Sequence, residues 1–143
     1  MDRTKVLIVD DEVDFSSALS ERMTSRGLTV ETVSNGAEAL KKVESGDYDA
    51  IVLDLVMPGM DGIETLKRIR AKKPELQIIL LTGHGSIQKG VESVKLGALD
   101  FLEKPAELSV LMEKIHQAKA NKMVLVEKKL EDSIQDILKR KAW

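Results

Sequence analysis

Five short apolar segments, separated by stretches of helical periodicity, dominate the N-terminal three-quarters of the chain. They are Lys5–Asp10, Leu28–Val33, Asp49–Asp54, Gln77–Thr82 and Ala98–Leu102. The first, third and fourth are continuous aliphatic runs rich in Val and Ile, which is typical of strands covered on both faces in a parallel sheet. The segment Leu28–Val33 partly alternates, as expected of an edge strand. The pattern therefore predicts five strands with helices between them.

The segments between these strands have apolar residues three and four positions apart, which is the spacing of one face of an α-helix. The residues expected to face inward are Phe15, Ala18, Leu19 and Met23 in the first helix, Ala39, Leu40 and Val43 in the second, Ile63, Leu66 and Ile69 in the third, Ile87, Val91 and Val94 in the fourth, and Leu108, Leu111, Met112 and Ile115 in the fifth, which follows Pro105. Five amphipathic helices are therefore predicted.

Short motifs mark the ends of these helices. The segment Asn35–Glu38 is typical of a capping box at the start of the second helix, and Asp61–Glu64 is a similar start for the third. Gly27 and Gly97 are the expected stops of the first and fourth helices. Gly90, in the middle of the fourth helix, costs about 1 kcal/mol relative to Ala, so we expect this helix to be the least stable.

The alternation of strand and helix predicts an α/β fold, a doubly wound, five-stranded parallel sheet of the flavodoxin-like type. The common order for five such strands is 2-1-3-4-5, with the switch point between strands 1 and 3. Further apolar residues at intervals of three or four predict one helix, or two nearly continuous ones, from about residue 106 to 138. We therefore expect a domain over residues 1–119 and a C-terminal helical tail over residues 120–143.

Composition narrows the class of protein. The 143 residues are 43% hydrophobic, enough for one packed core, and only 3% aromatic, so the base-stacking platforms of single-strand binders are nearly absent. With 22 basic and 24 acidic residues the net charge is -2, which disfavours direct nucleic-acid binding. The chain has no cysteine, and its longest apolar runs are four residues, too short to cross a bilayer. We expect a cytoplasmic protein that does not bind membranes.

Polar residues stand where the predicted strands end. Asp10 and Asp11 end the first strand, Asp54 the third and Thr82 the fourth, and Lys104 follows the fifth. The carboxyl ends of these parallel strands open on one edge of the sheet, where doubly wound folds bind ligands. Three converging carboxylates are costly unless positive charge lies among them or some of the acids are protonated. Lys104 supplies one positive charge, and Mg²⁺ is the usual cytosolic cation for the rest. In the alternative interpretation each acid caps a helix or solvates a loop.

The chemistry open to this edge is limited. The acids that follow the first strand would repel a phosphate, so a Gly-rich nucleotide site is excluded. The two histidines, His84 in a loop and His116 on a helix, do not form a Ser-His-Asp relay. The remaining chemistry is covalent: an aspartate attacks a phosphoryl group while metal and lysine neutralise its oxygens. Asp54 is the candidate nucleophile because it stands alone on the central strand.

Four motifs give the chain a family resemblance. They are Val9-Asp10-Asp11, Leu53–Gly62, Leu81-Thr82-Gly83 and Phe101–Pro105. Over about residues 4–119 the chain resembles the receiver domain of bacterial two-component response regulators. The Thr82–Gly85 loop and the tail resemble those of the NtrC-like enhancer-activator group. The resemblance implies a phosphoprotein that regulates transcription, and that catalyses only its own phosphoryl transfer and dephosphorylation.

The resemblance also implies a role for each site residue. Asp54 would accept a phosphoryl group from a phosphohistidine of a sensor histidine kinase. Asp11 and Asp54 would bind Mg²⁺ directly, the backbone carbonyl of Val56 would be a further ligand, and Asp10 would help through a water molecule. The acid pair and the phosphoacceptor would thus share one metal ion.

The remaining implied roles concern the response to phosphate. Lys104 would pair with the phosphoryl oxygens, Thr82 would hydrogen-bond to another of them, and Phe101 would be the aromatic residue that turns inward. The bond before Pro105 is cis in this family. His84, at the mouth of the site, is a candidate modulator of water attack on the acyl phosphate, or else an exposed loop histidine.

Other functions and other roles for the tail stay open at this point. A phosphatase with an aspartyl-phosphate intermediate, of the haloacid type, needs D-x-D after the first strand, whereas position 12 is Glu. A receiver-like adaptor that no longer responds to phosphate usually lacks one of the signature residues, and none is missing here. The tail fits a coiled-coil dimerisation segment, a helix packed on the domain, or a linker. A homodimer could also form through the face of the fourth helix, fifth strand and fifth helix.

Overall fold

Strands and helices alternate along the whole chain, as the apolar pattern predicts. The computed structural model describes residues 3–55, 57, 62–83 and 87–141. The elements are β1 (Lys5–Val9), α1 (Val13–Ser25), β2 (Thr29–Val33), α2 (Gly36–Ser45), β3 (Ala50–Asp54), α3 (Gly62–Lys72), β4 (Ile78–Thr82), α4 (Ile87–Lys95), β5 (Asp100–Glu103) and α5 (Leu108–Lys141).

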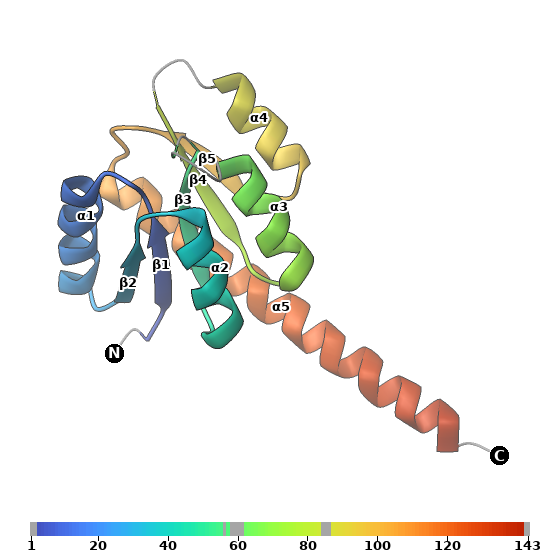
Figure 1. Cartoon of the computed structure of the whole chain (residues 1–143). Helices are drawn as coiled ribbons and strands as arrows, with labels where there is room; N and C mark the ends of the chain where they lie inside the picture. Colours follow the sequence, from blue (N-terminus) through green and yellow to red (C-terminus); the bar gives the residue numbers. More distant parts are fainter. Residues whose placement is uncertain (1–2, 56, 58–61, 84–86, 142–143) are drawn as a thin grey trace.

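The five strands form one parallel sheet in the order β2-β1-β3-β4-β5 (Figure 1). This order confirms the predicted doubly wound topology and puts the switch point between β1 and β3. The carboxyl ends of β1, β3 and β4 therefore lie at one edge of the sheet. In the described residues, no helix combines the length and the apolar character that crossing a membrane requires.

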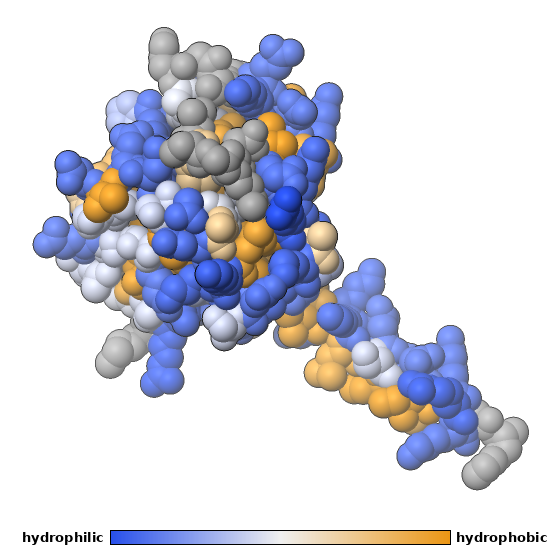
Figure 2. All heavy atoms as spheres, viewed as in Figure 1, coloured by the Kyte–Doolittle hydropathy of each residue, from blue (hydrophilic) through white to orange (hydrophobic). Residues whose placement is uncertain are grey.

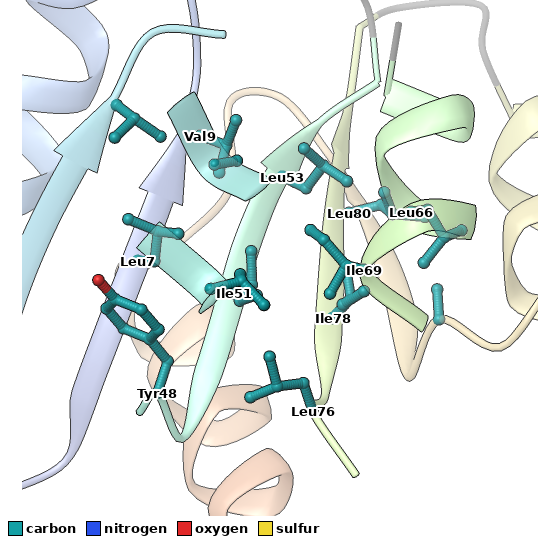
Figure 3. Packing of buried hydrophobic residues seen from close by; sticks show 14 of the residues in the cluster. Leu7, Val9, Tyr48, Ile51, Leu53, Leu66, Ile69, Leu76, Ile78 and Leu80 are labelled. Atoms are coloured by element: carbon teal, nitrogen blue, oxygen red, sulfur yellow. The ribbon is translucent and has the colours of Figure 1, made fainter. Parts of the chain in front are cut away.

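Two apolar layers bury the sheet, because alternate residues of each central strand point to opposite faces. On β1, Leu7 and Val9 face a cluster that includes Leu66 and Ile69 of α3, and Ala39 and Val43 of α2 (Figure 3). Val6 and Ile8 face the other cluster, which α1 and α5 cover. The central strands are buried on both sides, so their aliphatic runs are continuous.

The predicted helix ends are largely confirmed. The backbone N–H of Glu38 donates to Oδ1 of Asn35 at 2.9 Å, while the Glu38 carboxylate accepts from the N–H of Ser34 rather than of Asn35. Gly27 and Gly97 follow α1 and α4 with φ of 93° and 110°, the left-handed region where a glycine avoids strain. Asp61, the predicted cap of α3, lies outside the described residues.

The inward face of α4 differs from the prediction. Val91 and Val94 are 45% and 40% exposed, so the expectation that they face the core is wrong. The buried positions are Gly90 and Ser93, because the ring of Phe101 lies so close to Gly90 that an added Cβ would be 2.5 Å from it. The apolar stripe of α4 therefore faces outward. The side chain of Ile87 is not among those described.

The inward face of α1 also differs at one position. Ala18 is exposed, although its spacing from Phe15 and Leu19 predicts an inward orientation. Leu19 and Met23 are buried as expected, and Ser16 is the third buried residue of α1. Ser16 is accommodated because its hydroxyl donates to the carbonyl of Val13 at 3.1 Å.

A single helix, α5, occupies the C-terminal quarter of the chain, as the first of the two predicted alternatives has it. Leu111, Met112, Ile115 and Ala118 pack it against the sheet. From residue 123 to residue 141 every residue is exposed, and we call this part the projecting segment. Figure 1 shows it extending away from the domain, and Figure 2 shows an apolar stripe along it between charged side chains. The projecting segment therefore does not fold back onto the sheet.

The contact between Gly90 and Phe101 generates a prediction about stability. In an open helix Gly90→Ala would stabilise α4 by about 1 kcal/mol. Here the added methyl group meets the Phe101 ring, and overpacking of this kind costs about 1–3 kcal/mol. We expect a net destabilisation of about 1 kcal/mol in urea unfolding. In a Phe101→Ala background the sign should reverse, and stabilisation by Gly90→Ala in both backgrounds would contradict the packing described.

Candidate functional site

Two buried carboxylates stand at the carboxyl ends of the central strands. Asp10 follows β1 and is held there because its N–H donates to the carbonyl of Val33 at 3.1 Å. Asp54 is the last residue of β3 and pairs in register with Leu81 of β4. Their exposed fractions are 1% and 4%. Strand geometry thus places two acids side by side and largely out of water, as the sequence predicts.

Lys104 lies between these acids. Its backbone N–H donates to the carbonyl of Thr82 at 2.8 Å, which fixes the loop after β5 at the end of β4. Its Nζ is 2.8 Å from Oδ2 of Asp10, 3.2 Å from Oε1 of Glu12 and 3.6 Å from Oδ2 of Asp54. The peptide bond between Lys104 and Pro105 is cis, as predicted. One ammonium group therefore serves three carboxylates.

The electrostatic setting of Lys104 favours its charged form. Burial acts to lower the pKa of Lys104, but the hydrogen bond to Asp10 and the charge of Asp54 outweigh it and raise that pKa above its usual value. The Nζ also lies 4.4 Å from the centroid of the Phe15 ring, within the range of a cation–π contact. Lys104 is held as a cation by both kinds of contact.

Three acids of the described residues meet closely enough to share a metal ion. One ligand oxygen from each of Asp10, Glu12 and Asp54 lies within 4.8 Å of the others. Their three negative charges face a single positive charge on Lys104, and carboxylate oxygens are the donors that hard divalent cations prefer. The donor set therefore fits Mg²⁺. Asp11, expected as a direct ligand, is exposed and is not a member of this trio.

Glu12 is the member that the sequence analysis did not single out. It occupies the N-cap position of α1, and its N–H donates to Oδ1 of Asp10 at 2.9 Å. This local bond turns the chain so that the third consecutive acid returns to the same edge. Two sequence features point to Glu12: it ends the acidic run Asp10-Asp11-Glu12, and Phe15 follows it three positions later on the same helix face.

Thr82 and Phe101 lie beside the site on neighbouring strands. Thr82 is fully buried, and its hydroxyl donates to the carbonyl of Leu102 on β5 at 3.3 Å. Phe101, on the same strand as Leu102, is half-buried against Gly90 of α4. A hydroxyl at the site is thus bonded directly to the strand that carries the aromatic residue.

Two of the other predicted positions, Val56 and His84, are outside the described residues, so their roles stay predictions. His116 is exposed on α5. The arrangement that remains is a buried carboxylate, Asp54, flanked by a cation and by further carboxylates, which is suited to binding a metal ion and receiving an electrophilic, anionic group.

Comparison with known proteins agrees with this geometry. A family model described as response regulator receiver domain matches residues 6–116. The transcriptional regulatory protein TcrA of Mycobacterium tuberculosis is 36% identical over 111 residues, 78% of this chain and 44% of TcrA. The DNA-binding transcriptional regulator NtrC of Escherichia coli is 35% identical over 118 residues, 82% of this chain and 25% of NtrC. The chain thus spans less than half the length of these relatives.

Solved structures show the same fold. The receiver domain of NtrX from Brucella abortus superposes with a TM-score of 0.77 and 30% identity, and the match covers 80% of this chain and 98% of that one. A longer NtrX chain, in complex with ADP, gives a TM-score of 0.80 at 28% identity and covers 95% of this chain and 30% of its own. The second match therefore extends further along this chain than the first.

The shared lysine generates a prediction about charge balance. Lys104→Met leaves Asp10, Glu12 and Asp54 without their ammonium group, so we expect a loss of about 3–5 kcal/mol of unfolding free energy in low-salt buffer without divalent cations. Added Mg²⁺ should stabilise this variant more than the wild type, because the metal replaces the missing charge. Urea unfolding with and without Mg²⁺ measures both effects. Lys128→Met, on the exposed part of α5, is the control, and equal effects of the two substitutions would contradict the account.

Proposed function

The chain belongs to the response regulator receiver domain family, and on that premise we propose that it is a phosphorylation-activated signalling switch with Asp54 as its phosphoacceptor. The observation that carries the proposal is the position of Asp54, buried at the end of β3 with the Lys104 ammonium 3.6 Å away. A carboxylate so placed is a nucleophile suited to an electrophilic group whose negative charge Lys104 can pair with.

The proposed transfer is a nucleophilic displacement at phosphorus. A carboxylate oxygen of Asp54 forms the new O–P bond, and the P–N bond to a phosphohistidine of a sensor histidine kinase breaks. The electron pair of that bond stays with the imidazole, which takes up one proton from water and leaves as the neutral base. Lys104 pairs with the phosphoryl oxygens, and the chain acts as catalyst only for its own phosphorylation and dephosphorylation.

The metal requirement follows from the charge of the site. Asp11 and Asp54, the backbone carbonyl of Val56 and, through water, Asp10 would hold Mg²⁺. When bound, the ion supplies the positive charge that offsets the negative charge on the transferring group. Glu12, which lies with Asp10 and Asp54, adds a further oxygen donor at the same edge.

Phosphorylation changes what Thr82 and Phe101 can contact. The new group carries roughly two negative charges and three strong acceptors, so it competes with the Leu102 carbonyl for the Thr82 hydroxyl. A shift of Thr82 opens space for Phe101 to turn inward. Phe101 packs on Gly90, so its movement shifts α4. Val91 and Val94 of that helix are exposed, so the shift changes an apolar surface. The modification biases two arrangements of the α4-β5-α5 face.

The output of this switch is proposed to be dimerisation and, through it, regulation of transcription in the cytoplasm. Residues 1–119 form the receiver domain and residues 120–143 the tail. Along the tail, Met123, Val126, Leu130, Ile134 and Ile137 recur at intervals of three and four and are all exposed. The proposed partner is a second copy of the chain, which binds through this apolar stripe or through the α4-β5-α5 face. The net charge of -2 argues against direct binding of nucleic acid by this chain.

Labelling with a small phosphodonor tests the phosphoacceptor. Wild-type protein incubated with acetyl phosphate and Mg²⁺ should gain the mass of one phosphoryl group in intact-protein mass spectrometry, and the gain should disappear with hydroxylamine, which cleaves acyl phosphates. Asp54→Asn should gain none, because an amide oxygen is a poor nucleophile.

Asp132→Asn is the matched control, since it removes an exposed carboxylate from the tail and should be labelled like the wild type. Equal labelling of Asp54→Asn and the wild type would overturn the assignment of Asp54.

A further inference from the structure

A buried lysine lies where α5 leaves the domain. The side chain of Lys122 is only 10% exposed, although it follows the last buried apolar residue of α5, Ala118, by one helical turn. Its Nζ donates to the backbone carbonyl of Tyr48 at 2.7 Å and also contacts the carboxylate of Asp47. An ammonium group tolerates burial only when it is paired in this way, so the contact is a specific one.

The segment that receives Lys122 is itself firmly held. Tyr48 is 1% exposed at the base of β3 (Figure 3), and its hydroxyl donates to Oε2 of Glu31 at 3.0 Å. Burial and the neighbouring Glu31 raise the pKa of Tyr48 to about 12, so this hydroxyl keeps its proton at neutral pH. The next residue, Asp49, accepts a hydrogen bond from the N–H of Lys5 at 2.9 Å. Lys122 is thus hydrogen-bonded to a segment before β3 that two further hydrogen bonds tie to β1 and β2.

Lys122 is the last buried residue of α5. One turn earlier, Lys119 donates from Nζ to Oγ1 of Thr4 at 3.2 Å, so two lysines on one side of the helix reach the same end of the sheet. Beyond them, a hollow of about 300 Å³ is lined by Gln77, Asn121, Val124 and Leu125. The family model ends at residue 116, so Lys122 lies outside the part of the chain that it matches.

We propose that Lys122 is a positioning residue that fixes the direction in which the projecting segment leaves the domain. Leu111, Met112, Ile115 and Ala118 pack the earlier turns of α5 against the sheet, and Lys122 is the one buried residue in the turn from which the projecting segment leaves. A charge-assisted hydrogen bond sets both the rotation of the helix about its axis and its tilt. The clamp, meaning Lys122 with Asp47 and the Tyr48 carbonyl, therefore determines which way the stripe of the projecting segment faces.

This proposal stands apart from the function assigned to Asp54. The clamp lies at the amino ends of the strands, whereas Asp54 lies at their carboxyl ends, and the clamp contacts involve no site residue. The direction of the projecting segment is therefore fixed whether or not Asp54 is phosphorylated, and unphosphorylated protein is the sample in which to measure it.

Pulsed dipolar spectroscopy between two spin labels tests the clamp. The chain has no cysteine, so Ser25→Cys on α1 and Gln135→Cys on the projecting segment give one defined label pair at exposed positions. Labelled protein is diluted with unlabelled protein so that only distances within one chain are recorded. The parent should give a single narrow distance. Lys122→Met should replace it with a broad distribution, while Lys128→Met, which changes an exposed lysine further along the helix, should leave it narrow.

A second variant keeps the test decisive if Lys122→Met fails to fold. Asp47→Asn removes the carboxylate of a residue whose side chain is 85% exposed, and it leaves the Tyr48 carbonyl in place, so partial broadening is expected. In hydrogen exchange, amide protection over residues 119–125 should fall roughly tenfold in Lys122→Met, as expected for the loss of a hydrogen bond to a charged group. A narrow distance that is unchanged in Asp47→Asn, or in folded Lys122→Met, would overturn the proposal.

Discussion

Among the described residues, the carboxyl edge of the sheet gathers three carboxylates around one ammonium group. Asp10, Glu12 and Asp54 share the ammonium group of Lys104, and the strands that deliver them are fixed by a core buried on both faces. Carboxylates at such separations stay ionised together only when cations accompany them. The proposed functions all depend on this charge. Metal binding adds positive charge at that edge, phosphoryl transfer adds negative charge, and the switch responds to the change.

The acidic site lies at the carboxyl ends of the strands and the clamp at their amino ends, and α5 runs between the two. It begins just after Lys104 and Pro105, beside the acidic edge, crosses one face of the sheet and leaves the domain at Lys122 (Figure 1). The clamp at its exit fixes the direction of the projecting segment, whereas the proposed switch acts on the α4-β5-α5 face near the start of the helix.

Much of this arrangement could be predicted from the sequence, because its causes are local or topological. Continuous aliphatic runs predict buried parallel strands, and parallel strands of known order bring their carboxyl ends together. For that reason Asp10, Asp54 and Lys104 meet as expected. The cap formed by Asn35 and the glycine stop at Gly97 depend on neighbouring residues alone, and both were predictable from those neighbours.

The features that sequence patterns missed depend on contacts distant in the chain. The periodicity of α4 predicts Val91 as a core residue. The ring of Phe101 instead packs against Gly90, where there is no side chain, so this side of α4 faces the sheet. Glu12 joins the site because its backbone N–H donates to Oδ1 of Asp10, and this contact depends on the geometry of the helix start. The burial of Lys122 could not be predicted from its neighbours in the sequence, because its partner, the Tyr48 carbonyl, is distant in the chain.

Paramagnetic relaxation by Mn²⁺ tests the central claim most directly. Mn²⁺ prefers the same oxygen donors as Mg²⁺ and broadens the NMR signals of nearby amides. Titrated into uniformly ¹⁵N-labelled protein, it should broaden first and saturably the amides next to Asp10, Asp54 and Lys104, and excess Mg²⁺ should reverse the effect. Broadening centred on the acids of the projecting segment, or no saturable broadening at the strand ends, would contradict a shared, charge-deficient edge.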